Sequence, residues 1–256
     1  VIDFVMRHEG YHSVREALHF LEAIMSHSSQ KTSERAGEGQ EIHKNLSSFQ
    51  QHLPPQAGGD EKRELVFIKA HQIQHPVILA YLAKRGIPDG LSERYLREVY
   101  YRNNRTEKEF FAFGMQNRSG GYEIRAASDE YKFKSALITR DITLIKGQTE
   151  NSNTVNVFEG MLDFLSLLAM LNVSQLSGDS IVMHSLSSFQ PTLTAIRSMK
   201  YEKVNLFLDN NRTGKEHTEK FQSELGEIAF SQSDLFAPHE DVNDALVAND
   251  IPNFEK

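Results

Sequence analysis

Two stretches of the sequence end an apolar run in an acidic side chain. Residues 155–158 read Val-Asn-Val-Phe and precede Glu159, and residues 204–208 read Val-Asn-Leu-Phe-Leu and precede Asp209. β-Branched and aromatic residues are typical of buried strands, so both runs are expected to be β-strands. Parallel strands that lie side by side end at one edge of their sheet, which is where open α/β sheets bind ligands. Two carboxylates at that edge would suit a divalent cation such as magnesium.

The elements around these carboxylates alternate between strand and helix. Gly160 begins an apolar helix that continues to Leu171, and Gly214 precedes a polar helix. This alternation predicts an α/β fold with a four-stranded, mainly parallel sheet and helices on both of its faces. The predicted domain covers residues 151–256, with strands at 155–158, 180–184, 203–208 and 227–230 and helices at 160–171, 191–199 and 214–225.

Three motifs in this region resemble the Toprim domain of topoisomerases and bacterial primases. They are Phe-Glu-Gly-x-x-Asp at 158–163, Leu-Asp-Asn-Asn-Arg-x-Gly at 208–214 and Asp-Val-Asn-Asp at 241–244. The region is most similar to a primase-like branch of the family that is often carried on mobile elements. The resemblance implies a site that binds Mg²⁺ or Mn²⁺ for nucleotidyl transfer.

The resemblance also implies a role for each acidic residue. Glu159 would act as a metal ligand or as the general base, and Asp209 would act as a metal ligand. Asp241 and Asp244 are both candidates for a further acidic position near the end of the domain. Asp163 lies about one helical turn after Glu159 and would contact the metal ligands without binding the metal itself.

One position departs from the family pattern. The family has Asp-x-Asp after the strand that precedes Asp209, and here Asn211 stands where the second Asp is expected. An amide can offer a metal its carbonyl oxygen but no negative charge, so a site that includes Asn211 should bind magnesium more weakly. The departure leaves two possibilities open: an impaired enzyme, or a protein that binds nucleic acid without making primers.

A smaller α+β unit is expected before the Toprim-like region, over residues 64–150. It resembles the N-terminal subdomain of the primase core, which in that family forms one wall of the template groove. A short apolar run from Glu64 to Ala70 begins the unit. Helices are predicted at 75–86 and 91–99, strands at 109–117 and 121–125 around a turn at 118–120, and further strands at 133–136 and 142–145.

This smaller unit is also the more basic part of the chain. Residues 84–146 contain 13 Lys and Arg against 9 Asp and Glu, whereas the whole chain has a net charge of −7. Cations on strand edges can follow a phosphate backbone. Phe110, Phe111 and Phe113 could stack on bases, but alternation places Phe111 and Phe113 on one face, and core packing explains these two better. The candidate phosphate contacts are Arg118, Arg125, Lys132, Lys134 and Arg140.

The N-terminal part of the sequence carries weaker signals. Residues 1–25 resemble the last strand and helix of the zinc-ribbon domain that precedes the primase core in this family, so the zinc ligands would lie upstream. Residues 26–63 are polar and have little apolar periodicity, which predicts a flexible linker. The chain has no Cys, which excludes disulfides and cysteine-based zinc sites within it.

The function that these patterns favour is a primase-like nucleotidyltransferase. Its partners would be a single-stranded DNA template, nucleotides and a helicase or relaxase, in DNA replication or mobile-element transfer. No apolar stretch is long enough to span a bilayer and no signal peptide is visible, so a cytoplasmic protein without membrane contact is expected. The alternatives are a non-catalytic module that binds nucleic acid or a partner protein, and a Toprim nuclease.

Overall fold

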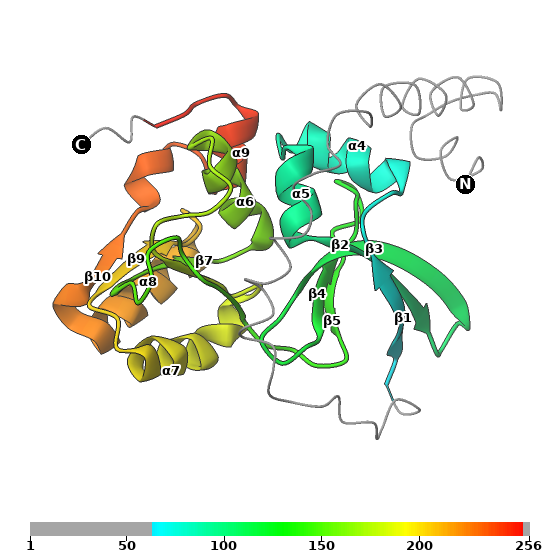
Figure 1. Cartoon of the computed structure of the whole chain (residues 1–256), viewed down its shortest axis with the longest axis horizontal. Helices are drawn as coiled ribbons and strands as arrows, with labels where there is room; N and C mark the ends of the chain where they lie inside the picture. Colours follow the sequence, from blue (N-terminus) through cyan, green and yellow to red (C-terminus); the bar gives the residue numbers. More distant parts are fainter. Residues whose placement is uncertain (1–62, 253–256) are drawn as a thin grey trace.

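The structure is a computed structural model, and it describes residues 63–252 (Figure 1). The predicted zinc-ribbon remnant at 1–25 and nearly all of the predicted linker lie outside these residues. Two five-stranded sheets lie side by side, and helices pack on each of them. In the described part of the chain, no helix combines the length and the apolar character that a membrane span requires.

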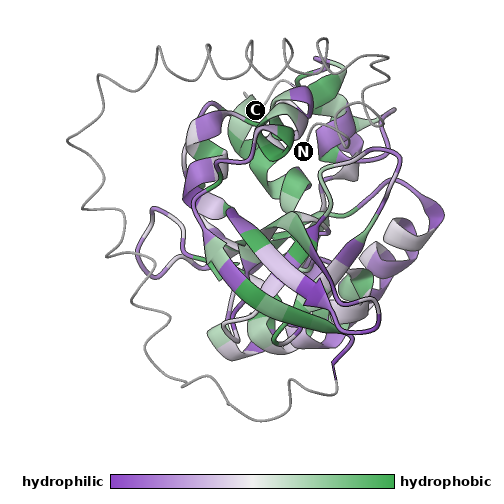
Figure 2. Cartoon of the chain, turned by 90° about the vertical axis from the view of Figure 1, so that its right-hand side faces the viewer, coloured by the Kyte–Doolittle hydropathy of each residue, from purple (hydrophilic) through white to green (hydrophobic). Residues whose placement is uncertain are grey.

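The first sheet is an antiparallel meander in which each strand pairs with the next one in the chain. Hydrophobic and hydrophilic residues alternate along its strands (Figure 2), as expected when the two faces have different surroundings. Its strands are β1 (Leu65–His71), β2 (Arg97–Asn103), β3 (Lys108–Gln116), β4 (Tyr122–Arg125) and β5 (Lys134–Leu137).

This sheet is rolled so that strands far apart in its order meet. Phe67 on β1 stacks on Tyr122 on β4 with ring centroids 5.6 Å apart, although two strands lie between them in the sheet. Phe111 and Phe113 point to the other face, where Phe113 is fully buried, so their interpretation as core residues is confirmed. The enclosed face holds a small core made of Val99, Tyr101, Ala112, Ile124 and Leu137.

Two helices pack on the other face of the first sheet. The first, α4 (Pro76–Lys84), is capped by His75, whose Nδ1 accepts a hydrogen bond from a backbone N–H of the first turn. The second, α5 (Asp89–Tyr95), ends where β2 begins. The predicted helix at 91–99 is therefore wrong after residue 95. The β-branched and aromatic side chains that follow favour a strand, and they pair with β3.

The second sheet has the order β10-β9-β7-β8-β6. Four of its strands are parallel, as the sequence predicts, and β6 is antiparallel to its neighbour β8. Residues 142–145 were expected in the smaller unit, and that expectation is wrong. Local sequence indicates a strand but cannot say which sheet it joins. The strands are β6 (Thr143–Ile145), β7 (Thr154–Phe158), β8 (Asp179–Val182), β9 (Lys203–Phe207) and β10 (Ala229–Ser231).

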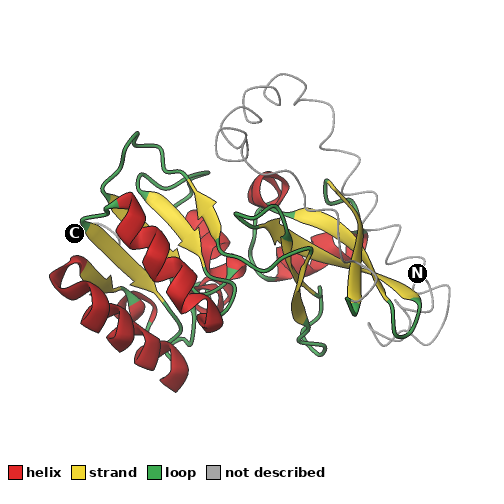
Figure 3. Cartoon of the chain, turned by 90° about the horizontal axis from the view of Figure 1, so that it is seen from below, coloured by secondary structure: helices red, strands yellow, loops and turns green. Residues whose placement is uncertain are grey.

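Helices cover both faces of the second sheet (Figure 3). Phe158 and Phe207 pack with α6 on one face, whereas Val157 and Leu206 pack with α7 and α8 on the other. Short 3₁₀ turns occur at Leu186–Ser188, Gly226–Ile228 and Ser233–Phe236. The α-helices are α6 (Met161–Met170), α7 (Phe189–Met199), α8 (Arg212–Leu225) and α9 (Val242–Val247).

A shared core joins the two halves. Tyr95 on α5 packs edge-on against Phe164 on α6 at 5.0 Å, and its hydroxyl donates to the backbone oxygen of Ser174 at 2.6 Å. Asn243 on α9 donates hydrogen bonds to the backbone oxygen of Arg85, after α4, and to Ser166 on α6, each at 2.9 Å. Because these contacts are buried or partly buried and come from both halves, the walls of any cavity between the sheets are held in place.

Candidate functional site

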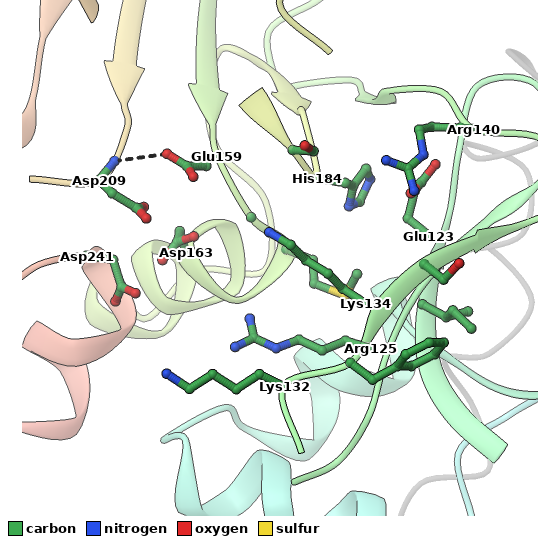
Figure 4. A pocket seen from close by; sticks show the side chains of 16 residues that line it. Glu123, Arg125, Lys132, Lys134, Arg140, Glu159, Asp163, His184, Asp209 and Asp241 are labelled. Atoms are coloured by element: carbon green, nitrogen blue, oxygen red, sulfur yellow. Dashed lines mark hydrogen bonds between the residues drawn. The ribbon is translucent and has the colours of Figure 1, made fainter. Parts of the chain in front are cut away.

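A cavity of about 360 Å³ opens between the two sheets (Figure 4). The second sheet and its helices contribute four acidic residues, and β4, β5 and the segments that follow them contribute four basic residues. The cavity therefore has an acidic wall and a basic wall that face each other. The acidic residues are Glu159, Asp163, Asp209 and Asp241, and the basic residues are Arg125, Lys132, Lys134 and Arg140.

The acidic wall is built from strand ends and helix starts. Glu159 follows β7 and Asp209 lies two residues after the end of β9, and these two strands are parallel neighbours. The backbone N–H of Asp209 donates to Glu159 Oε2 at 3.4 Å, so the two residues are in contact. Asp241 is the N-cap of α9, where its Oδ1 accepts from the backbone N–H of Asp244 at 2.7 Å. The two strand ends therefore bring Glu159 and Asp209 together at one edge of the sheet, as their pattern predicted.

Gly160 gives Asp163 its place in this wall. A Cβ atom at Gly160 would lie 2.8 Å from Asp163 Oδ2, closer than real Cβ atoms come to other atoms. The missing side chain therefore lets the carboxyl group of Asp163 lie against the turn between β7 and α6. Asp163 is buried, and its Oδ1 has no hydrogen-bond partner among the described residues.

Burial and mutual repulsion raise the pKa values of these acidic groups. Burial raises the pKa of Asp209 to about 8, and the charges of Glu159 and Asp241 contribute to this rise. Burial raises the pKa of Asp163 well above its ordinary value, with repulsion from Asp241 and Asp209 as the next cause. Burial is also the main reason that the pKa values of Glu159 and Asp241 are raised. A divalent cation would relieve both effects, because it replaces protons and neutralises the repulsion.

The four cations of the basic wall form no ion pair within the described part of the chain, although Arg125, Lys134 and Arg140 are near enough to carboxylates to lower their pKa values. Within residues 63–252, Arg125, Lys132, Lys134 and Arg140 have no carboxylate oxygen within ion-pair distance. Lys134 is close enough to the acidic wall to lower the pKa values of Glu159 and Asp209, although burial outweighs it in both. Unpaired cations at the wall of a cavity attract anions, and phosphate is the anion that they suit best.

Three residues predicted for the site lie outside this cavity: Arg118, Asp244 and Asn211. Arg118 donates two hydrogen bonds to Asp141, at 3.0 and 2.8 Å, and does not line the cavity. Its guanidinium stabilises the loop between β5 and β6, so the structure does not place it as a phosphate contact. Asp244 is half-exposed and lies 3.8 Å from Arg85, outside the main cavity. Of the two candidates on α9, the structure brings Asp241 to the acidic wall.

Asn211 is also absent from the cavity lining, because it caps α8. Its Oδ1 accepts a hydrogen bond from the backbone N–H of Gly214 at 3.0 Å. Its Nδ2 donates to Asp209 Oδ2 at 3.4 Å and to Glu240 Oε1 at 2.9 Å. The oxygen that was expected to bind metal is thus engaged in the helix cap, while the amide N–H groups hold two neighbouring carboxylates.

Sequence reasoning missed two titratable residues that line the cavity, Glu123 and His184. Thr143 Oγ1 donates to the backbone oxygen of Gln116 and therefore accepts from His184 Nε2, at 2.8 Å. Burial lowers the pKa of His184 to about 3, so the ring is neutral. His184 lies just after β8, so the strand-end rule that identified Glu159 would have found it. Glu123 is a buried acid inside a β-strand, where local sequence gives no such signal.

The donors of the acidic wall fit a hard divalent cation in their chemistry. Carboxylate oxygens are the ligands that Mg²⁺ and Mn²⁺ prefer, and Glu159, Asp209 and Asp241 supply them from three different elements. Within the described residues, no three His, Cys, Asp or Glu side chains are already close enough together to form a complete metal site. Side-chain rotation would therefore have to accompany metal binding.

Comparison with known proteins matches these two halves to two families. Residues 156–246 match the Toprim-like family, and residues 67–137 match a domain of unknown function, DUF8464. The second half of the chain is thus a Toprim-like domain of mixed α/β fold, as its motifs predicted. No curated protein matches the chain.

Two solved structures from bacteriophage T7 are similar to this chain. One is the primase fragment of the T7 primase-helicase protein, with 16% identity, a TM-score of 0.47, and coverage of 66% of this chain and 68% of that one. The other shows T7 lagging-strand DNA polymerase interacting with primase domains of two gp4 subunits bound to an RNA/DNA hybrid and dTTP. It has 13% identity, a TM-score of 0.46, and coverage of 71% of this chain and 87% of that one.

Proposed function

We propose that this chain is the core of a primase-like nucleotidyltransferase that acts on a single-stranded DNA template. The observation that carries this proposal is the cavity in which the acidic wall of a Toprim-like domain faces four cations that have no ion-pair partner within residues 63–252. Phosphoryl transfer depends mainly on positioning and on neutralising charge at the phosphate oxygens. A cavity with a cation site on one wall and fixed positive charges on the other offers both.

Each wall has a distinct role in this proposal. Glu159, Asp209 and Asp241 would hold Mg²⁺ or Mn²⁺, which when bound neutralises charge on the reacting phosphate. Glu159 follows β7 at the centre of the wall and is the candidate general base. Burial raises its pKa, and a carboxylate with a raised pKa is a stronger base.

The basic wall would bind the phosphates of the template and of the incoming nucleotide. Arg125 and Lys134 project towards the acidic residues across the cavity (Figure 4). Phosphates held between the two walls would lie beside the carboxylates that take the metal. We further propose a helicase or relaxase as the partner in replication or mobile-element transfer, with cytoplasmic localisation.

Primer synthesis on a single-stranded template, with Mg²⁺ or Mn²⁺ and labelled nucleotides, tests this function directly. Glu159→Gln and Asp209→Asn should each lower the rate by a factor on the order of 100 or more, because each removes a charge from the metal site. Lys134→Gln should weaken DNA binding. It should also reduce the slope of the logarithm of affinity against the logarithm of salt concentration by about 1, as expected for the loss of one phosphate contact. Lys108→Gln is the matched control, because Lys108 is exposed on β3 and does not line the cavity.

The second candidate is a module that binds nucleic acid without synthesising primers. The specific observation in its favour is that Asn211 replaces an expected acidic ligand and that its oxygen caps α8 instead. Retained binding of single-stranded DNA, with no primer made under either metal, would select this candidate. If the unmodified chain did not bind single-stranded DNA, both candidate functions would be rejected.

A further inference from the structure

Four aromatic rings form a continuous series from the first sheet to the rim of the cavity. Phe110 on β3 stacks on Tyr101 on β2, with ring centroids 5.7 Å apart and planes 24° apart. Tyr101 stacks on Phe133 at 6.0 Å and 13°, and Phe133 stacks on Tyr131 at 5.8 Å and 5°. The last two rings are nearly parallel, and Phe133 also lines the cavity.

Exposure differs sharply along this series. Tyr101, inside it, is 6% exposed, whereas Tyr131, the last ring, is 66% exposed. The hydroxyl of Tyr131 forms no hydrogen bond with the other described residues, so no polar contact there accounts for its position. Core packing explains Tyr101 and Phe133. It does not explain a terminal ring that rests on Phe133 by one face and leaves most of its surface in solvent.

Cations alternate with these rings along the chain. Lys132 and Lys134 lie on either side of Phe133 in the sequence, and both line the cavity. In the segment Tyr131-Lys132-Phe133-Lys134, the last three residues line the cavity, and the ring of Tyr131 stacks on Phe133 beside them. Proteins that bind single-stranded nucleic acid without reading its sequence combine these two features, with cations for the phosphates and ring faces for the bases.

We propose that Tyr131 is a base-stacking site at the rim of the cavity. It would take one base of a single-stranded nucleic acid whose neighbouring phosphates contact Lys132 and Lys134. This role rests on the nucleic-acid binding proposed above. A protein partner is disfavoured, because Ser128, Asp129 and Glu130 lie next to Tyr131 in the sequence and supply no apolar surround.

The sequence offers a clean reporter for this site, because it contains no tryptophan. In Tyr131→Trp the single indole would stack on Phe133 in the same place, and a base stacked on its free face should quench its emission. Phe230→Trp is the matched control, because Phe230 is 45% exposed on the edge strand β10 and does not line the cavity. Each variant is titrated, in the full chain, with an oligonucleotide of about 12 thymidines.

The affinities of two further variants complete the test. Tyr131→Ala should weaken binding of the oligonucleotide, measured by anisotropy of a labelled strand, by about 5- to 150-fold, and Tyr131→Phe should retain it. Quenching in Tyr131→Trp but not in Phe230→Trp would support the proposal even if Tyr131→Ala does not fold. If Tyr131→Trp bound the oligonucleotide by anisotropy but its indole emission were not quenched, the stacking site would be overturned and the proposed function left intact. No binding by the unmodified chain would overturn both.

Discussion

Replacing Asp209 with Asn should stabilise the metal-free protein, and increasingly so as the pH rises. Burial and the neighbouring carboxylates raise the pKa of Asp209 from 3.8 to about 8 in the folded chain. Between these values the unfolded chain has released the proton while the folded chain still holds it. The unfolded state therefore binds fewer protons, and the free energy of unfolding falls as the pH rises through this window.

The size of the effect follows from the same shift. One pH unit corresponds to about 1.4 kcal/mol, so a shift of roughly four units limits the destabilisation to about 6 kcal/mol above pH 8. The actual effect is smaller than this limit for two reasons. Glu159 and Asp241 can take up part of the titration of Asp209, and the side chain of Asp209 is partly solvated. We therefore expect Asp209→Asn to increase the free energy of unfolding by about 2 kcal/mol at pH 8.5 and by less than half of that at pH 5.

Urea unfolding in EDTA at the two pH values measures this difference. Asp234→Asn is the matched control, because Asp234 lies in a short 3₁₀ turn and does not line the cavity. It should change the stability little at either pH. If Asp209→Asn and the unmodified chain were equally stable at both pH values, the acidic wall would not be repulsive, and the case for a cation binding there would lose its physical basis.

Two further outcomes follow from the same geometry. Mg²⁺ should raise the melting temperature of the unmodified chain more at pH 8 than at pH 5, because protons compete with the metal for the acidic wall. If Mg²⁺ raised the melting temperature of Glu159→Gln by as much as that of the unmodified chain, the metal would bind elsewhere. Gly214→Ala should cost more than about 3 kcal/mol of stability, because its Cβ would collide with the backbone oxygen of Asp209. Gly160→Ala should cost less, since its Cβ meets only the side chain of Asp163; equal melting temperatures for the two variants would contradict this ranking.

The sequence predicted those parts of the fold and site that depend on local pattern and parallel pairing. The apolar runs before Glu159 and Asp209 indicated strands, and strand-helix alternation indicated that they run parallel, so their meeting at one edge followed. The same logic failed for β6. Its three residues have the pattern of a strand in either sheet, and only tertiary packing assigns them to the second.

The failures in the site have a related cause. Arg118 has the residue type and the turn position of a phosphate contact, but Asp141, 23 residues later, binds it. Such a pairing depends on where β5 ends and β6 begins, which local sequence does not specify. The aromatic series was missed for the same reason. Tyr101 and Phe110 pair across the neighbouring strands β2 and β3, but Phe133 meets Tyr101 only when the first sheet rolls up.

Asn211 shows how one departure from a family pattern can affect stability and metal affinity in opposite directions. Asp also caps helices well, so Asn211→Asp should preserve the cap of α8. It would remove the amide N–H groups that bond Asp209 and Glu240 and put a third negative charge beside them. The metal-free chain should therefore lose about 1–3 kcal/mol of stability at pH 8.

The same charge should tighten the binding of Mg²⁺, because Asn211 lies in contact with Asp209. One added charge a few ångströms from the cation contributes about 1 kcal/mol or more, which is a roughly fivefold gain in affinity. Calorimetry with Mg²⁺ and urea unfolding in EDTA measure the two effects, and Asn211→Ser serves as a cap without added charge. Tighter metal binding together with lower metal-free stability would mean that Asn211 favours the folded state without metal at the expense of metal affinity. Unchanged affinity would place the metal away from Asp209, because a charge in contact with a metal ligand cannot leave that metal's affinity untouched.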